Sequence, residues 1–149
     1  MKVLDTRAYL SVVQELTEAG NEVAVRIAGG SMVPFLADGR DSVCLAKPHR
    51  PLKRGDIVCY QRRDGSFVLH RICRVRPEGY YIVGDGQQEL EGPVARRQIF
   101  ALAVKVHRKG QWIGEENLCW RFFAGAWLRL RPFRYALLRA YGVLRGRKG

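Results

Sequence analysis

Apolar and polar residues alternate along most of this 149-residue chain in patterns that predict short elements. Near the N-terminus, apolar residues recur at helical spacing and predict a helix over residues 5–19, capped by Asp5 or Thr6. Residues 23–27 then alternate between apolar and polar and predict a half-buried strand that runs into Gly29-Gly30. The apolar positions of the predicted helix are Tyr9, Val12, Val13 and Leu16.

From about residue 22 to residue 107 the pattern is one of short strands separated by turns. Sequences typical of turns divide the apolar stretches, and Asp64-Gly65 between two apolar runs is typical of a β-hairpin. Many short strands at this spacing favour a mainly β, coiled or barrel-like fold over a parallel α/β layout. The predicted strands are residues 23–27, 42–46, 56–61, 66–75, 80–83 and 99–107.

The pattern changes after Gly114, where aromatic residues mix with arginines. From Leu130 onwards an apolar stripe at helical spacing predicts an amphipathic helix, and Pro132 fits its first turn. We therefore divide the chain into a β domain with its N-terminal helix, residues 1–114, and a basic aromatic C-terminal helical segment, residues 115–149. The stripe consists of Leu130, Phe133, Leu137, Tyr141 and Leu144.

The net charge of +12 is concentrated in this C-terminal segment, because no acidic residue follows Glu116. A basic tail of this kind favours anionic membrane surfaces or nucleic acid. Residues 118–148 fit two interpretations. They could lie in a membrane interface with arginines on lipid phosphates, or they could cover the apolar face of the β fold with their arginines solvated.

No part of the sequence reads as a signal peptide, and no run of about 18 apolar residues predicts a transmembrane helix. The four cysteines contain no C-x-x-C pair and mostly occupy apolar, strand-like positions, so we expect reduced thiols in the core. This usage favours the cytoplasm, and no metal or other cofactor is expected. The cysteines are Cys44, Cys59, Cys73 and Cys119.

The segment Gly30-Ser31-Met32-Val33-Pro34 is poor material for a helix or a strand and holds a candidate nucleophile. Serine is a weak nucleophile unless an adjacent base takes its proton. His70 is the best candidate base because a predicted strand would hold its ring rigidly. His49 lies in a proline-bracketed loop and His107 beside basic residues, so we expect both to be solvated or structural.

Asp85, in the turn Gly84-Asp85-Gly86 after the strand over 80–83, suits the role of orienting an imidazole. The alternative is an ordinary turn aspartate. Gly29 and Gly30 permit unusual backbone angles directly before Ser31. The Ser31 N–H is therefore a natural donor to an oxyanion.

Taken together, four motifs resemble those of the signal-peptidase and SOS-repressor-like serine peptidase superfamily. Their order and spacing match over roughly residues 22–107, and the histidine at the base position resembles the endoplasmic-reticulum and archaeal branch rather than the lysine-using one. The motifs are Ser31-Met32-Val33-Pro34, Gly55-Asp56-Ile57-Val58, Leu69-His70-Arg71-Ile72 and Gly84-Asp85.

The resemblance implies a serine endopeptidase that works through an acyl-enzyme on an extended peptide, which would pair with residues 23–27. Ser31 would be the nucleophile, His70 the general base and Asp85 its partner. Without the membrane anchor of many family members, the chain resembles compact stand-alone bacterial members, whose substrates could be cytoplasmic leader peptides or a partner protein. Its expected location is the cytoplasm or the inner membrane face. The residues expected to form the oxyanion and substrate site are Gly29, Gly30, Met32 and Pro34.

Two other functions fit parts of the sequence. A non-catalytic peptide-binding module could use the same fold, although such a module commonly loses the serine or the base, and Ser31 and His70 are both retained. The net charge and the terminal Arg-Gly-Arg-Lys-Gly would suit a nucleic-acid-binding module. No helix-turn-helix pattern or zinc-ligand spacing accompanies them, so the peptidase is preferred and no nucleic-acid partner is expected.

Overall fold

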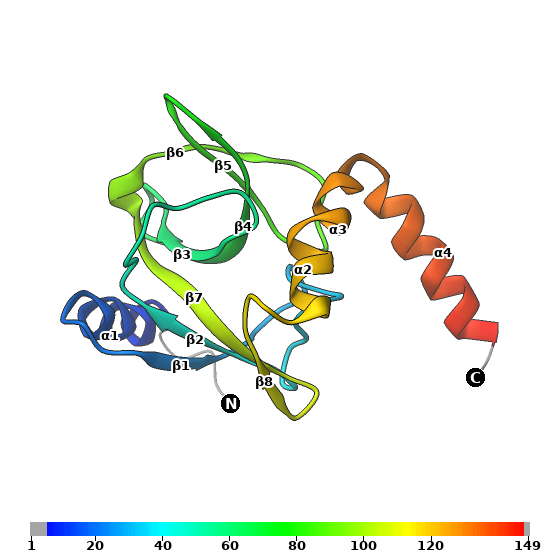
Figure 1. Ribbon diagram of the computed structural model, residues 1–149, viewed down its shortest axis with the longest axis horizontal. Helices are drawn as coiled ribbons and strands as arrows, with labels where there is room; N and C mark the ends of the chain where they lie inside the picture. Colours follow the sequence, from blue (N-terminus) through cyan, green and yellow to red (C-terminus); the bar gives the residue numbers. More distant parts are fainter. Residues whose placement is uncertain (1–5, 148–149) are drawn as a thin grey trace.

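The fold is mainly β, with one open antiparallel sheet and helices at both ends of the chain (Figure 1). The computed structural model describes residues 6–147, and side chains only within residues 8–142. The eight strands found there are β1 (Val23–Arg26), β2 (Ser42–Ala46), β3 (Ile57–Gln61), β4 (Phe67–Arg76), β5 (Gly79–Val83), β6 (Glu91–Val94), β7 (Ile99–Arg108) and β8 (Gln111–Ile113).

The sheet order is β1-β2-β7-β3-β4-β5-β6, and β8 pairs with the far end of β7. The edge strands β1 and β6 do not pair with each other, so the sheet curves without closing into a barrel. The predicted mainly β, coiled fold is confirmed, and the six predicted strands agree with the observed ones to within about a residue at each end.

The strands β6 and β8 were not predicted. Gly92-Pro93, a pair that is typical of turns, lies inside β6. Proline is tolerated there because β6 is an edge strand, where a missing N–H leaves no central ladder bond unmade. Strand β8 has only three residues, too few for a period-two pattern to be visible.

Both faces of the central strands are buried, each in its own apolar cluster. Along β3, Ile57 and Cys59 belong to a first cluster, while Val58 and Tyr60 belong to a second. Successive side chains of a strand point to opposite faces, so this alternation places a hydrophobic core on each side of the sheet. The near-continuous apolar run of β3 follows from that double burial.

Helix α1 (Thr6–Glu18) confirms the predicted N-terminal helix, but a different face of it points inward. Val13 is 2% exposed and Thr17 is fully buried, with the Thr17 hydroxyl donating to the Val13 carbonyl. Because that hydroxyl is satisfied within the helix, a threonine can occupy the buried stripe. Asp5, one of the two predicted caps, lies outside the described residues. The predicted apolar positions that are in fact exposed are Tyr9, Val12 and Leu16.

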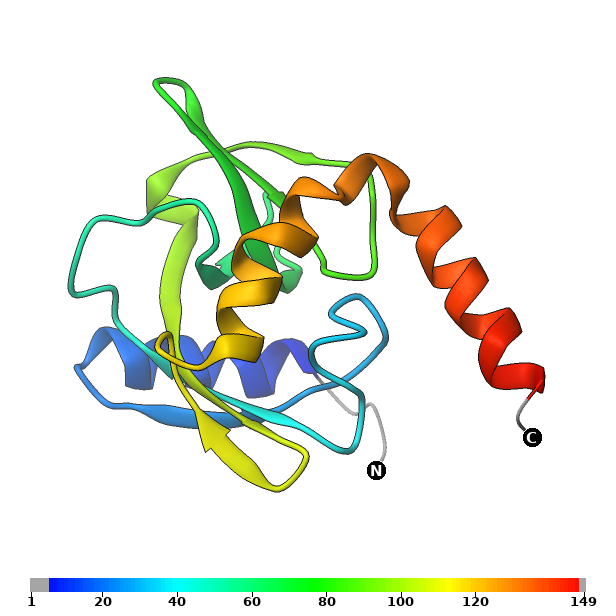
Figure 2. The ribbon, with the colours of Figure 1, turned by 45° about the vertical axis from the view of Figure 1, so that its right-hand side comes forward.

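The first part of the C-terminal segment covers the sheet. Asn117 caps the N-terminus of helix α2 (Leu118–Ala124), because its side chain accepts hydrogen bonds from two backbone N–H groups. Helix α3 (Ala126–Arg129) follows α2. Trp120, Phe123 and Trp127 are buried in the first cluster, and Figure 2 shows these two helices lying across the sheet. For residues 118–129 the covering interpretation is therefore confirmed.

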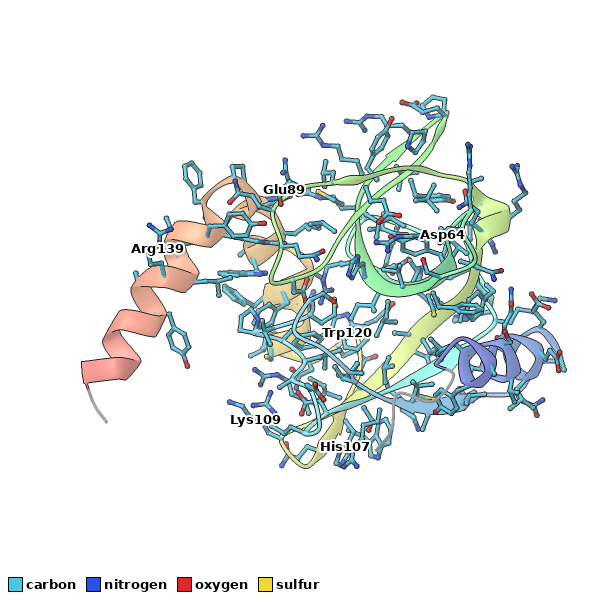
Figure 3. The ribbon with its side chains drawn as sticks, turned by 180° about the vertical axis from the view of Figure 1, so that it is seen from behind. Asp64, Glu89, His107, Lys109, Trp120 and Arg139 are labelled. Carbon is cyan, nitrogen blue, oxygen red and sulfur yellow. The ribbon has the colours of Figure 1, made fainter. Side chains whose placement is uncertain are left out.

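The last helix, α4 (Arg134–Arg147), behaves differently. It comes directly after the short 3-10 helix η2 (Arg131–Phe133) and projects away from the sheet (Figures 1 and 2). The other 3-10 helix, η1 (Arg96–Gln98), lies between β6 and β7. Arg139 lies on this projecting helix, whereas Trp120 lies within the body of the molecule (Figure 3). No helix of the described part is long and apolar enough to cross a membrane. The stripe residues that are exposed are Leu130, Phe133, Leu137 and Tyr141.

Candidate functional site

Ser31 lies at a tight turn that the hydrophobic core anchors from behind. The Val33 N–H donates to the Gly30 carbonyl at 3.3 Å and closes this turn. Met32 is 2% exposed and Phe35 is fully buried, both in the first cluster. Ser31 itself is half-buried, and its hydroxyl forms no hydrogen bond with the described residues. The core therefore fixes the turn while leaving the serine oxygen unengaged.

This burial corrects the prediction only for the Met32 side chain, which cannot contact a substrate directly. An apolar side chain directly after the serine pulls the turn onto the core, because removing it from water is favourable. Pro34 is half-buried, and its carbonyl accepts a long hydrogen bond of 3.4 Å from Arg108. Both residues hold the turn, and the Met32 side chain does not face an open site.

The backbone around Ser31 offers unpaired N–H groups. Neither the Ser31 nor the Met32 N–H has a hydrogen-bond partner among the described residues. Gly29 has φ of +79°, and its N–H donates to Asp38 at 3.1 Å. At Gly30 a Cβ would meet nothing within 4 Å. Of the two glycines, only Gly29 is in a conformation that requires glycine.

The Ser31 turn packs directly against the turn that carries Asp85. The Gly86 N–H donates to the Ser31 carbonyl at 2.8 Å. A Cβ added at Gly84 would collide with that same carbonyl oxygen, so only glycine permits this approach of two backbones. The sequence motifs around Ser31 and Gly84-Asp85 are therefore brought together.

His70 lies on β4, the strand that pairs with the one leading into this turn. Val83, the residue before Gly84, pairs with Arg71, the residue after His70. His70 is 6% exposed, and its cross-strand partner Val58 belongs to the second cluster. Burial lowers the pKa of His70 to about 4, so the imidazole is neutral at pH 7.

The imidazole nitrogens of His70 are unengaged but not sealed off. They form no hydrogen bond with the described residues, and none joins His70 to Ser31. Among the described residues, the fully buried side-chain polar atoms without a hydrogen-bond partner are the Tyr60 hydroxyl and Arg134 Nε. The His70 nitrogens are not among these atoms, so the ring edge retains some access to solvent. Catalytic hydrogen bonds are often long before substrate binds.

Asp85 does not hold His70, which corrects the predicted pairing. Its two carboxylate oxygens accept from Arg71 Nε and Nη2, each at 2.8 Å, and Arg71 Nη1 donates to the Gly55 carbonyl at 2.8 Å. Both side chains are fully buried. Because neighbours along a strand point to opposite faces, the Asp85 carboxylate meets Arg71 rather than His70. Asp85 is therefore a structural partner of the strand.

Another carboxylate acts on His70 more strongly than Asp85 does. Glu91 pairs with Ile82, which pairs with Ile72, so register places Glu91 on the His70 face of the sheet. The negative charge of Glu91 raises the pKa of His70 more than the charge of Asp85 does. Burial, which lowers the pKa of His70, has a larger effect than either charge. Arg62 offsets the charge of Glu91, because its guanidinium binds both Glu91 oxygens. No sequence pattern indicated a role for Glu91, because β6 was not predicted.

The C-terminal segment holds the Asp85 turn in place. Trp127 Nε1 donates to the Asp85 carbonyl at 2.7 Å. Arg134 Nη1 donates to the carbonyls of Gly84 and Gln87, at 2.8 and 2.9 Å, and the whole Arg134 side chain is buried. Arginines of this segment were expected on its solvated face, so the structural role of Arg134 was missed. Its position off the apolar stripe gave no indication of it.

The two other histidines were expected to be solvated or structural, and Asp56 belongs to another of the sequence motifs. His49 is exposed, and the His107 ring lies 5.0 Å from the Trp112 ring, its cross-strand neighbour. Asp56 binds the Arg50 guanidinium through both oxygens and also accepts from the Lys53 N–H. This arrangement agrees with a carboxylate that shapes the entry to β3.

Comparison with known proteins adds no assignment: no protein-family model, no curated protein and no solved structure matches this chain. Its function has to be argued from its own residues and their geometry.

Proposed function

We propose that this protein is a serine endopeptidase of the signal-peptidase-like type, with Ser31 as nucleophile and His70 as general base. One observation carries the proposal. An unpaired serine hydroxyl lies on a core-anchored turn, and that turn packs against the segment leaving the strand beside a buried, neutral histidine. The substrate we propose is a leader peptide or a partner protein in the cytoplasm.

The unengaged groups match the needs of acyl transfer. Ser31 Oγ would attack a peptide carbonyl carbon while His70 takes its proton, and the amide C–N bond would break as His70 returns that proton to the leaving amine. Water would then hydrolyse the serine ester. The free N–H groups of Ser31 and Met32 are available to an oxyanion. A neutral imidazole can accept the proton, whereas imidazolium could not.

The edge strand β1 is suited to bind an extended peptide. It pairs only with β2 within the described residues, so its other edge is open to main-chain hydrogen bonds. The chain leaves β1 towards Gly29 and Ser31, so a peptide added to this edge would run towards the serine. Strand addition supplies affinity through the backbone, and pockets for alternate side chains supply specificity.

A serine-directed fluorophosphonate tests both residue roles. We expect the probe to label Ser31, as located by mass spectrometry of the labelled peptide, and Ser31→Ala to remain unlabelled. His70→Ala should slow labelling at least about 100-fold, the lower range for a lost general base. His49→Ala is the matched control because His49 is exposed, and it should label at the wild-type rate. Full-rate labelling of His70→Ala, or labelling at another residue, would contradict the assignment.

A further inference from the structure

A cleft of about 740 Å³ lies where the loop before β3 and the outer half of β4 meet α3 and η2. Cationic side chains come from all of these elements, and no carboxylate from the described residues lines the cleft. Val75 and Pro132 contribute exposed apolar surface. The cations are Lys53, Arg54, Arg74, Arg76, Arg129 and Arg131.

None of these six cations forms an ion pair within the described part of the chain. The ion pairs there use Arg40, Arg50, Arg62 and Arg71, none of which lines the cleft. Arg131 donates to the Gln88 carbonyl and Arg76 to the neighbouring Val75 carbonyl. Their charges also help to lower the pKa of Glu89 and of Glu78, respectively, but neither arginine forms an ion pair with these acids. Six like charges around one hollow repel one another, and a bound anion would relieve that repulsion.

Exposed apolar residues border the same cleft. Val75, which lines it, is 42% exposed, while Leu130 and Phe133 flank its arginines and Pro132 and are 38% and 62% exposed. Beyond them α4 continues with the exposed side chains of Leu137 and Tyr141. Cations that bind phosphates beside apolar side chains that enter the acyl boundary are the features of an interfacial lipid site.

Nucleic acid is the less suitable anion for this surface. Single-stranded nucleic acid gains affinity by stacking its bases on aromatic side chains. Two of the three residues at the rim, Val75 and Leu130, are aliphatic and offer no ring for stacking. Aliphatic side chains gain free energy in the acyl boundary of a membrane instead.

We propose that the cleft, with its apolar rim, binds the phosphate headgroups of anionic phospholipids and attaches the protein peripherally to a membrane. The six cations bind the phosphates, and Val75, Leu130 and Phe133 enter the boundary between headgroups and acyl chains. Arg131 reaches both the cleft and Gln88, so the surface lies beside the turn that carries Asp85. The proposal does not depend on catalysis, and Ser31→Ala should bind vesicles as the wild type does.

Vesicle co-sedimentation of the full chain tests the site. The cleft variant combines Arg54→Gln, Arg74→Gln and Arg129→Gln, which are exposed and whose side chains form no hydrogen bond or ion pair with the described residues. It should bind vesicles of phosphatidylcholine and phosphatidylglycerol roughly 100-fold more weakly, at about fivefold for each cation near an anionic surface. The control variant combines Lys47→Gln, Arg63→Gln and Arg97→Gln, which removes the same charge from exposed positions outside the cleft. It should bind within about threefold of wild type.

Several results would overturn the proposal. They are wild-type binding by the cleft variant, an equal loss in the control variant, and equal binding of the wild type to vesicles of phosphatidylcholine alone. Inorganic phosphate and a single-stranded oligonucleotide serve as further probes. A thermal shift with free phosphate but no vesicle binding identifies a soluble anion instead. Oligonucleotide binding that the cleft variant loses, with vesicle binding unchanged, identifies nucleic acid. Circular dichroism of both variants establishes that each is folded.

Discussion

His70 and Arg71 are neighbours on β4 that point to opposite faces of the sheet, and they differ in how completely their side chains are hydrogen-bonded. On one face, the Arg71 guanidinium makes three hydrogen bonds of 2.8 Å, two to Asp85 and one to the Gly55 carbonyl. On the other face, the His70 ring makes none with the described residues. The Ser31 hydroxyl, on the turn that packs against Gly86, makes none with them either. Adjacent residues of one strand thus have opposite chemical environments.

The hydrogen-bonded Arg71–Asp85 pair is suited to supporting the structure, whereas the unpaired side chains of Ser31 and His70 are free to react. Buried polar groups are nearly always paired, because an unpaired one costs the free energy of its lost hydration. The Arg71–Asp85 pair meets that requirement and joins β4 to the Gly84–Gly86 turn. The Ser31 turn rests on the same turn, so a saturated network positions groups that stay free. Unengaged polar groups on a rigid support are what an incoming substrate can use.

Breaking the saturated network should have the largest effect. Asp85→Ala leaves Arg71 buried without its counter-charge, and we expect the free energy of unfolding to fall by about 3–5 kcal/mol. Urea denaturation measures the change. Combining Arg71→Met with Asp85→Leu should cost less than Asp85→Ala alone, because it leaves no unpaired buried charge.

The exposed ion pair between Arg50 and Glu115 provides a matched control for Asp85→Ala. Glu115 is 45% exposed, and Glu115→Ala should change the free energy of unfolding by less than about 1 kcal/mol. If Asp85→Ala unfolds at the same urea concentration as Glu115→Ala, the Arg71–Asp85 pair is not the support described above.

Displacing Ser31 from the Gly84–Gly86 turn should have the second-largest effect. In Gly84→Ala the new methyl group meets the Ser31 carbonyl and pushes the two turns apart. A misplacement of about 1 Å can slow catalysis about 100-fold, and we expect a similar loss in the rate of Ser31 labelling. Gly142→Ala is the control, because a Cβ there meets nothing within 4 Å. Labelling of Gly84→Ala at the rate of this control would show that the contact does not position Ser31.

Local patterns predicted the elements that local physics determines. Alternation and helical spacing identified α1, six strands and the C-terminal helical region, and the turn motifs placed Ser31 and Asp85 on turns. The grouping of these motifs also anticipated that the Ser31 turn and the Gly84–Gly86 turn lie in contact.

Long-range contacts were beyond this kind of prediction. The fold of the Gly84–Gly86 turn decides which face of β4 the Asp85 carboxylate contacts. The sequence pattern of β4 alone is compatible with either His70 or Arg71 as the partner of Asp85, and the structure shows Arg71. Arg134 follows the polar side of a helix pattern, yet it is fully buried because the carbonyls of Gly84 and Gln87 are there to accept its protons. Those partners lie 50 and 47 residues away in the chain.

The pH dependence of Ser31 labelling by the fluorophosphonate tests the central claim, that a buried neutral His70 activates Ser31. Only the neutral imidazole can accept the serine proton, so the rate should rise with pH through the pKa of His70, which burial lowers to about 4. At pH 5 the wild type should retain about nine-tenths of its rate at neutral pH, and His70→Ala should lose this titration. A rate at pH 5 of only about one-thirtieth, as for a histidine of ordinary pKa, or an unchanged profile in His70→Ala, would contradict the account.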